Sequence, residues 1–284
     1  MKSNLRVLVL FILITASVAS VNGQTVLDGI YIKEHTKTAK LVGYPSLREA
    51  DVMWSKRVWR VMDLQEKLNH PFYYPLEASA DRKSLFDIIK TALLVDGNMT
   101  AYSTGVTGQE DDFRTPLLVS DVKNILSKID TVYTPDVDTG EMIQKIQPKD
   151  VVTQDIKRYK IKEDWYFDKQ RSERGVRIIG IAPMREKITS DGEATGSYET
   201  LFWLYFPECR YVFANWEVFN RSNDSERRSY DDIFWKRQFS SYIIKESNPY
   251  DRNINMVYQG MDALLESERI KEDIFTFEHD LWSY

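Results

Sequence analysis

Apolar residues recur with a nearly helical period between residues 46 and 68. Ser46 and Glu49 have the spacing of a capping box, in which both side chains bind free backbone N–H groups at a helix start. Asn69, His70 and Pro71 then provide a stop signal. The pattern predicts an amphipathic helix whose apolar positions are Leu47, Ala50, Trp54, Val58, Val61, Met62, Leu64 and Leu68.

Two further helices are expected in the first half of the chain. Ser84 and Asp87 mark the start of one, apolar residues follow at helical spacing as far as Leu93, and Gly97 ends it. Residues 121–129 predict a shorter helix. The first half therefore has a mainly helical pattern.

The second half begins with short alternation of charged and apolar residues. Residues 156–167 and 177–184 flank a polar turn at 172–175, which favours an antiparallel hairpin. Residues 201–206 predict a third strand that Pro207 ends, and residues 211–219, 233–244 and 255–265 predict helices. The expected fold class is α+β, with helices packed on a small antiparallel β-sheet.

Breaks in these patterns predict a domain organisation. Residues 46–130 would form a mainly helical lobe, and residues 151–284 an α+β lobe with the hairpin and C-terminal helices. The connector is expected at residues 131–150, which hold Pro135, Gly140 and Pro148 without a sustained period. Residues 24–45 would form an extended N-terminal arm.

The first 23 residues have the features of a secretory signal peptide. Lys2 and Arg6 precede an apolar run that is too short to span a bilayer, and small residues follow it. Cleavage after Ala19 or before Gln24 fits. Cys209 is the single cysteine, so an internal disulfide is excluded and packing must hold the exported protein together. A bacterial periplasm is the expected compartment.

The charge balance argues against a general nucleic-acid binder. The 38 basic residues face 43 acidic ones, a net charge of −5, whereas displacement of phosphate counterions needs a cationic surface. The charge is also uneven, because residues 155–177 hold eight basic and five acidic residues and residues 261–284 hold two and seven. Such patches can steer a head-to-tail contact between copies, although solvated charged faces are commoner.

The sequence shows no motif for catalysis, a cofactor or a metal. His35, His70 and His279 lie far apart, and Cys209 has no nearby histidine, which favours a buried structural cysteine. A calcium-like stretch at residues 136–147 lacks the required glycine and bidentate glutamate. Phosphate-loop and nucleophile-elbow patterns are also absent. A catalytic pair of carboxylates that are distant in the sequence but close in the fold remains open as an alternative.

Aromatic residues gather in short runs, and neighbouring side chains on a strand face opposite sides. Some must then be exposed or covered by another chain, unless helices bury both faces of a central strand. Both alternatives remain open. The candidate contact residues are Leu27, Ile30, Tyr31 and Ile32 in the arm, with Tyr73, Tyr74, Trp165 and Trp203.

Five stretches resemble the GldN (PorN) family of the type IX secretion system and gliding machinery of Bacteroidota. They are residues 44–60, 69–74, 161–168, 177–183 and 230–237. The resemblance implies a periplasmic structural subunit without catalytic activity. It also implies a ring of several copies with the outer-membrane lipoprotein GldK (PorK), contact with the periplasmic region of GldM (PorM), and attachment to the outer membrane through the lipoprotein alone.

Two other functions are kept as alternatives. One is a periplasmic hydrolase, which would need two carboxyl groups close together in a cleft. The other is a module that binds peptidoglycan or another glycan through exposed aromatic rings.

Overall fold

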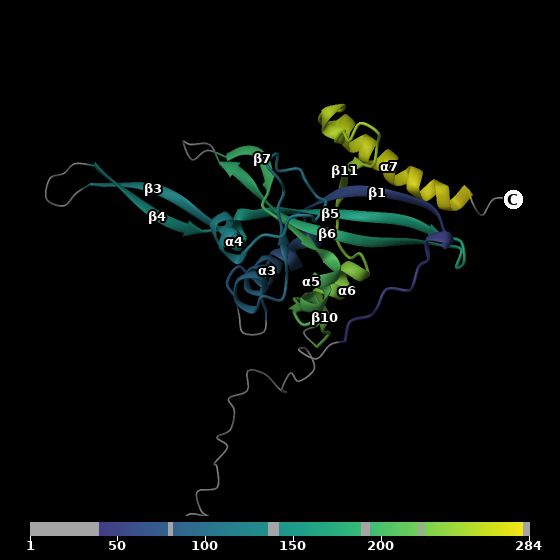
Figure 1. Cartoon of the computed structure of the whole chain (residues 1–284), viewed down its shortest axis with the longest axis horizontal. Helices are drawn as coiled ribbons and strands as arrows, with labels where there is room; N and C mark the ends of the chain where they lie inside the picture. The colour runs from purple at the N-terminus through teal and green to yellow at the C-terminus, as the bar shows by residue number, and fades with distance from the viewer. Residues whose placement is uncertain are drawn as a thin grey trace, which may run out of the picture. The chain divides into compact units, whose positions relative to one another are not determined.

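A computed structural model describes residues 40–78, 82–135, 142–188, 194–220, 223 and 225–280, which belong to one compact unit (Figure 1). The strands are β1 (Val52–Asp63), β2 (Ala101–Tyr102), β3 (Ser127–Pro135), β4 (Met142–Asp150), β5 (Ile156–Asp168), β6 (Glu173–Ile188), β7 (Ala194–Thr200), β8 (Trp203–Tyr205), β9 (Glu217–Val218), β10 (Arg228–Ser229) and β11 (Tyr242–Glu246).

The helices are mostly short. The α-helices are α2 (His70–Tyr73), α3 (Leu85–Thr91), α4 (Val119–Leu126), α5 (Phe206–Phe213), α6 (Tyr230–Trp235) and α7 (Met261–Asp280). Single turns are η2 (Glu49–Asp51), η3 (Lys67–Asn69), η5 (Thr153–Asp155) and η6 (Ile254–Met256), and a π-helical turn, η4 (Ala92–Asp96), continues α3. In the described segments no helix is long and apolar enough to cross a bilayer.

The fold is α+β, but the sheet is larger than the small one expected. Seven antiparallel strands run in the order β11-β1-β5-β6-β8-β2, and β7 pairs with the far end of β6. The long β5–β6 hairpin forms its centre and confirms the hairpin predicted from the sequence. The third predicted strand is present as β8.

The helix predicted across residues 46–68 is wrong, because most of this stretch is strand β1. β1 pairs with β5 on one side and β11 on the other, and residues Val58–Met62 are buried on both faces. Apolar side chains on two covered faces produce a nearly continuous apolar run, which periodicity alone does not distinguish from a helix. The β-branched and aromatic content of β1 is the signal that favours a strand.

The two faces of the sheet carry different layers. On one face, Val58 of β1 packs with Ile270 and Ile274 of α7, and Met62 joins the main core beneath α3, α5 and α6. The opposite face holds Trp59 and Val61 of β1, which are in register with Lys162 and Lys160 of β5. A loop between β2 and α4 covers part of this second face, where Phe113 contacts Trp203 at 6.0 Å between ring centroids.

Other helix predictions succeed where the end signals are local. The Oγ atom of Ser84 accepts a hydrogen bond from the Asp87 amide at 3.1 Å at the start of α3, and Gly97 ends the extended helix with φ of +63°. The tail differs from expectation, since residues 233–244 divide into the end of α6, a loop and β11. Helix α7 begins at Met261, several residues later than predicted.

The stretch expected as a connector at residues 131–150 contributes to the β3–β4 hairpin. This hairpin forms a two-stranded sheet of its own, apart from the seven-stranded sheet (Figure 1). Strands from both predicted lobes pair directly, because β1 lies beside β5.

Candidate interaction surfaces

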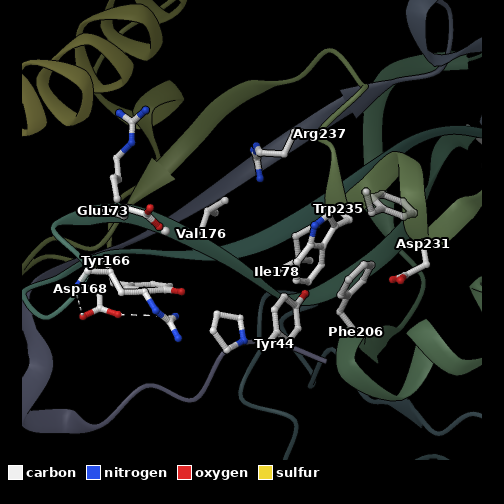
Figure 2. A pocket seen from close by; sticks show the side chains of 15 residues that line it. Tyr44, Tyr166, Asp168, Glu173, Val176, Ile178, Phe206, Asp231, Trp235 and Arg237 are labelled. Carbon is white, nitrogen blue, oxygen red and sulfur yellow. Dashed lines mark hydrogen bonds and ion pairs between the residues drawn. The ribbon is translucent and has the colours of Figure 1, made fainter. Parts of the chain in front are cut away.

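The described end of the N-terminal arm is fixed against the folded unit. We call Val42–Pro45 the strap. The Val42 carbonyl accepts a hydrogen bond from Arg210 of α5 at 2.8 Å, and the Pro45 carbonyl accepts one from Arg177 of β6 at 2.5 Å. Between them, the Tyr44 ring stacks on Trp235 with 5.1 Å between centroids (Figure 2).

A buried ion pair supports the strap. Arg210 donates two hydrogen bonds to the Asp231 carboxylate, from Nε to Oδ1 at 2.7 Å and from Nη2 to Oδ2 at 3.0 Å. The side chains of Arg210 and Asp231 are almost fully buried. Arg210 also lies 4.2 Å from the Tyr44 ring centroid. Burial raises the pKa of Tyr44, while the charge of Arg210 acts in the opposite direction. Tyr44 is thus a docked residue.

A cavity of about 240 Å³ lies beside the strap (Figure 2). Two of its carboxylates are already engaged, because Asp231 binds Arg210 and Asp168 accepts hydrogen bonds from the amides of Gln170 and Arg171. This arrangement gives no support to the acid pair that the hydrolase alternative needs.

Trp165, one of the proposed contact residues, lies on the face covered by α7. Its indole N–H donates to the carboxylate of Glu163 at 3.1 Å, and its ring lies between Arg174 and Arg237, each just over 5 Å from the centroid. Glu163 is fully buried and pairs with Arg237 at 3.0 Å. Trp165 is therefore half-buried inside a polar cluster.

Tyr73 and Tyr74 lie at the end of α2. Tyr73 packs partly against the main core, and burial raises its pKa. Tyr74 is 46% exposed and meets Tyr73 edge-on at 5.1 Å. Tyr74 is thus the more accessible of the two for a partner.

Trp203 is a core residue, with 1% of its surface exposed. It packs beside Gly180, where a Cβ atom would lie 2.4 Å from the Phe113 ring and 3.2 Å from Trp203 itself. Substitution of Trp203 would therefore affect folding before any interface. Leu27, Ile30, Tyr31 and Ile32 lie outside the described residues.

The structure does not bring these aromatic candidates into one site. Tyr73 packs on the main core, Trp165 joins the cluster beneath α7, and Trp203 belongs to the cluster with Trp59 on the other face. Sequence reasoning treated them together because aromatic runs do not show which face each ring occupies.

The sequence analysis did not identify a polar basin on the face with Trp59. It has a volume of about 800 Å³, and its floor includes Val61, Lys160 and Tyr242 from three neighbouring strands. Residues 104–109, β7 and the segment before α7 form its walls. We call this site the basic basin, since Arg158, Lys160, Lys187 and Lys245 line it with two carboxylates, Asp111 and Glu199.

The carboxylates of the basin are already paired. Asp111 accepts hydrogen bonds from Lys162 at 3.0 Å and from the indole of Trp59, and Glu199 binds Arg185. Asp111 therefore fixes the loop onto the sheet.

Two of the lining cations have partners outside the basin, and Lys160 does not. Arg158 binds Asp63 at 2.9 Å, and Lys245 binds Asp251 at 2.5 Å. Within the described part of the chain, Lys160 makes no ion pair or hydrogen bond through its ammonium. Burial lowers the pKa of Lys160, with Asp111 acting in the opposite direction.

Exposed apolar side chains recur along residues 250–265, which include one residue of the basin lining. Met256 lines the basin and is 61% exposed. We call the set the apolar rim; it consists of Tyr250, Met256, Val257, Tyr258, Met261, Leu264 and Leu265. Exposed apolar patches of this kind are typical of protein contacts. The sequence analysis predicted a helix over residues 255–265 and did not single out this stretch as a contact surface.

The cysteine and histidine considered as catalytic or metal-binding candidates are packed against neighbouring residues in the structure. Cys209 is buried, donates to the Tyr205 carbonyl at 3.3 Å, and has a pKa raised by burial, so it is unsuited to form a thiolate. His70 packs edge-on against Tyr74. Across the described segments, no group of three His, Cys, Asp or Glu residues could hold a metal ion.

Comparison with known families adds a direct assignment. The model of the family described as "Gliding motility associated protein GldN" matches residues 47–283. The chain belongs to the GldN family. No curated protein sequence matches it.

The matched region of this GldN protein runs from the residues before β1 through α7, so it contains the basic basin and the apolar rim. The strap lies just before it. GldN is a structural family associated with gliding motility and is not known as an enzyme family.

Proposed function

We propose that this protein is a non-enzymatic structural subunit of the type IX secretion and gliding machinery in the periplasm. Several copies form a ring with the outer-membrane lipoprotein GldK (PorK), and the ring contacts the periplasmic region of GldM (PorM). The lipoprotein attaches the subunit to the outer membrane. Membership of the GldN family over most of the chain is the observation that carries the proposal.

The exposed apolar rim supports a role in assembly. Tyr250, Met261 and Leu265 are each more than 60% exposed, and they lie within sixteen residues of one another. Stable interfaces bury about 1,600 Å² and use aromatic and long apolar side chains as anchors. A scaffold subunit would cover these side chains in the assembled ring.

Co-elution with the lipoprotein tests the proposal. The mature chain is mixed with GldK that lacks its lipid anchor, and the mixture is separated by size-exclusion chromatography with light scattering. We expect one species much heavier than a one-to-one complex. Separate elution at micromolar concentrations of both proteins would contradict the proposal.

A further inference from the structure

We propose that the basic basin of one copy binds the acidic C-terminal half of α7 from a second copy, in a head-to-tail contact. The inference rests on the proposed function, because it names the surfaces through which copies in the ring would meet.

The basin offers a cation, Lys160, that makes no direct ion pair within the described residues. The carboxylates around the basin already have partners. Asp111 accepts hydrogen bonds from Lys162 and Trp59. Asp63 pairs with Arg158, and Asp251 pairs with Lys245. Lys160 lies among them, half-buried, with its ammonium 5.6 Å from the Trp203 ring centroid and with no ion pair or hydrogen bond within the described residues. Because burial of an unpaired charge is costly, a carboxylate entering the basin would compensate it.

Helix α7 offers the complementary charge. Residues 261–284 hold seven acidic and two basic residues. Several of these acids pair along the helix, for example Glu268 with Lys271 and Asp273 with Arg269, whereas exposed Glu272 makes no ion pair or hydrogen bond in the described structure. The C-terminal end of the helix dipole adds partial negative charge near the last turn.

The contact also has apolar anchors. Phe275 of α7 is 61% exposed, although it lies in the acidic half of the helix. Met256 lines the basin, and it and the next two residues, Val257 and Tyr258, are each more than 40% exposed. Packing of Phe275 on these residues would bury apolar surface beside the charge pair, as central interface anchors do.

The placement requires two copies. Helix α7 packs over Val58, whereas Lys160 lies beside Val61 on the opposite face of the same sheet. A helix on one face cannot reach a basin on the other within one chain. Each copy therefore presents one helix and one basin, and such heterologous contacts close into a ring when the rotation allows.

Charge exchange tests the contact. Self-association of the mature chain is measured by analytical ultracentrifugation at about 0.15 M salt, where partly buried charge pairs remain effective. We expect Lys160→Glu and Glu272→Lys each to weaken association at least tenfold. Lys123→Glu on α4, outside the basin, is the matched control and is expected to associate like the natural chain.

Mixing the two variants gives the decisive result. In an equal mixture, the acidic basin of the Lys160→Glu variant can take the basic helix of the Glu272→Lys variant, and the remaining natural basin and natural helix also match. We expect association to return in the mixture and in the double variant. Thermal melting confirms folding, and the exposed Glu272 tests the contact even if Lys160→Glu fails to fold.

Three results would overturn the contact. They are natural association in both single variants, no recovery on mixing, and loss of peptidoglycan co-sedimentation in Lys160→Glu with self-association unchanged, which would make the basin a glycan site. Binding of each variant to GldK separates the two proposals. Intact GldK binding with unaffected self-association refutes this contact alone, whereas absent binding by the natural chain refutes the proposed function.

Discussion

At the residue scale, the Arg210–Asp231 pair links three parts of the fold. Asp231 lies on α6, Arg210 on α5, and the guanidinium also binds the strap through the Val42 carbonyl. A buried pair contributes little net energy when intact, but loss of one partner leaves a buried charge uncompensated. The pair therefore makes docking of the strap depend on the packing of two helices.

Replacement of Asp231 tests this role. We expect Asp231→Asn to lower the free energy of unfolding by about 3–5 kcal/mol, because Arg210 would keep its charge without a carboxylate. Asp164→Asn is the matched control, since Asp164 pairs with Arg57 near the surface and should cost at most about 1 kcal/mol. Urea unfolding at pH 7 measures both, and equal losses would contradict the assignment.

Buried tyrosines predict a weakness at alkaline pH. Burial raises the pKa of Tyr159 and of Tyr230. Above pH of about 10 the unfolded chain loses these protons while the folded protein keeps them, so stability falls as pH rises, by about 1.4 kcal/mol per pH unit for each group.

Tyr159→Phe isolates one of these groups. The Tyr159 hydroxyl is buried and has no hydrogen-bond partner in the described structure, so its removal should change stability little at pH 7. Between about pH 10 and 11 we expect the decline in unfolding free energy to be smaller by about 1 kcal/mol. A slope identical to that of the natural chain would show that Tyr159 does not control it.

At the element scale, short-range signals explain which predictions succeeded. The β5–β6 hairpin has a polar turn between two alternating segments, and α3 has an Asp87 amide bound by Ser84. The prediction for β1 was wrong because its pairing strands, β11 and β5, come from distant sequence, and packing on both faces makes its apolar run nearly continuous. The basin was missed for the same reason, since its residues meet only when the sheet forms. The alternation of Lys160 and Lys162 was its one local signal.

Helix α7 protects the edge of the sheet. Strand β11 lies at one end of the strand order, where exposed N–H groups invite pairing with other chains. The Ile243 amide instead donates to the Ser267 hydroxyl of α7 at 2.8 Å. The helix thus shields a part of the strand that no other described strand covers.

Removal of this hydroxyl tests the edge contact. We expect Ser267→Ala to cost about 1–3 kcal/mol, because the buried Ile243 amide would lose its acceptor. Ser55→Ala on the exposed part of β1 should change stability by less than about 0.5 kcal/mol. Thermal unfolding compares them, and faster hydrogen exchange at Ile243 should accompany the loss. Unchanged exchange would contradict this role.

Substitutions at two aromatic residues, Trp203 and Tyr74, distinguish an effect on folding from an effect on assembly. Trp203 is core, so Trp203→Ala should cost about 3–5 kcal/mol. Tyr74 is half-exposed, and Tyr74→Ala should leave the melting curve nearly unchanged while weakening complex formation with GldK. Calorimetry and co-elution measure the two effects. Undiminished binding of Tyr74→Ala would remove Tyr74 from the interface.

At the scale of the whole molecule, the exposed surfaces are suited to contacts with other protein chains. A seven-stranded sheet carries α7 on one face and the basic basin on the other, and the side chains of the apolar rim are exposed. The sequence predicted family and fold class. It could not predict the contact surfaces, because exposure depends on how distant strands pack.

The most direct test of the account is the mass of the complex formed with GldK. Mass photometry of the mature protein mixed with lipid-free lipoprotein should show large particles that contain many copies of both chains. Particles no larger than the separate proteins, from folded preparations of both, would contradict the central claim that this GldN protein works as a scaffold subunit.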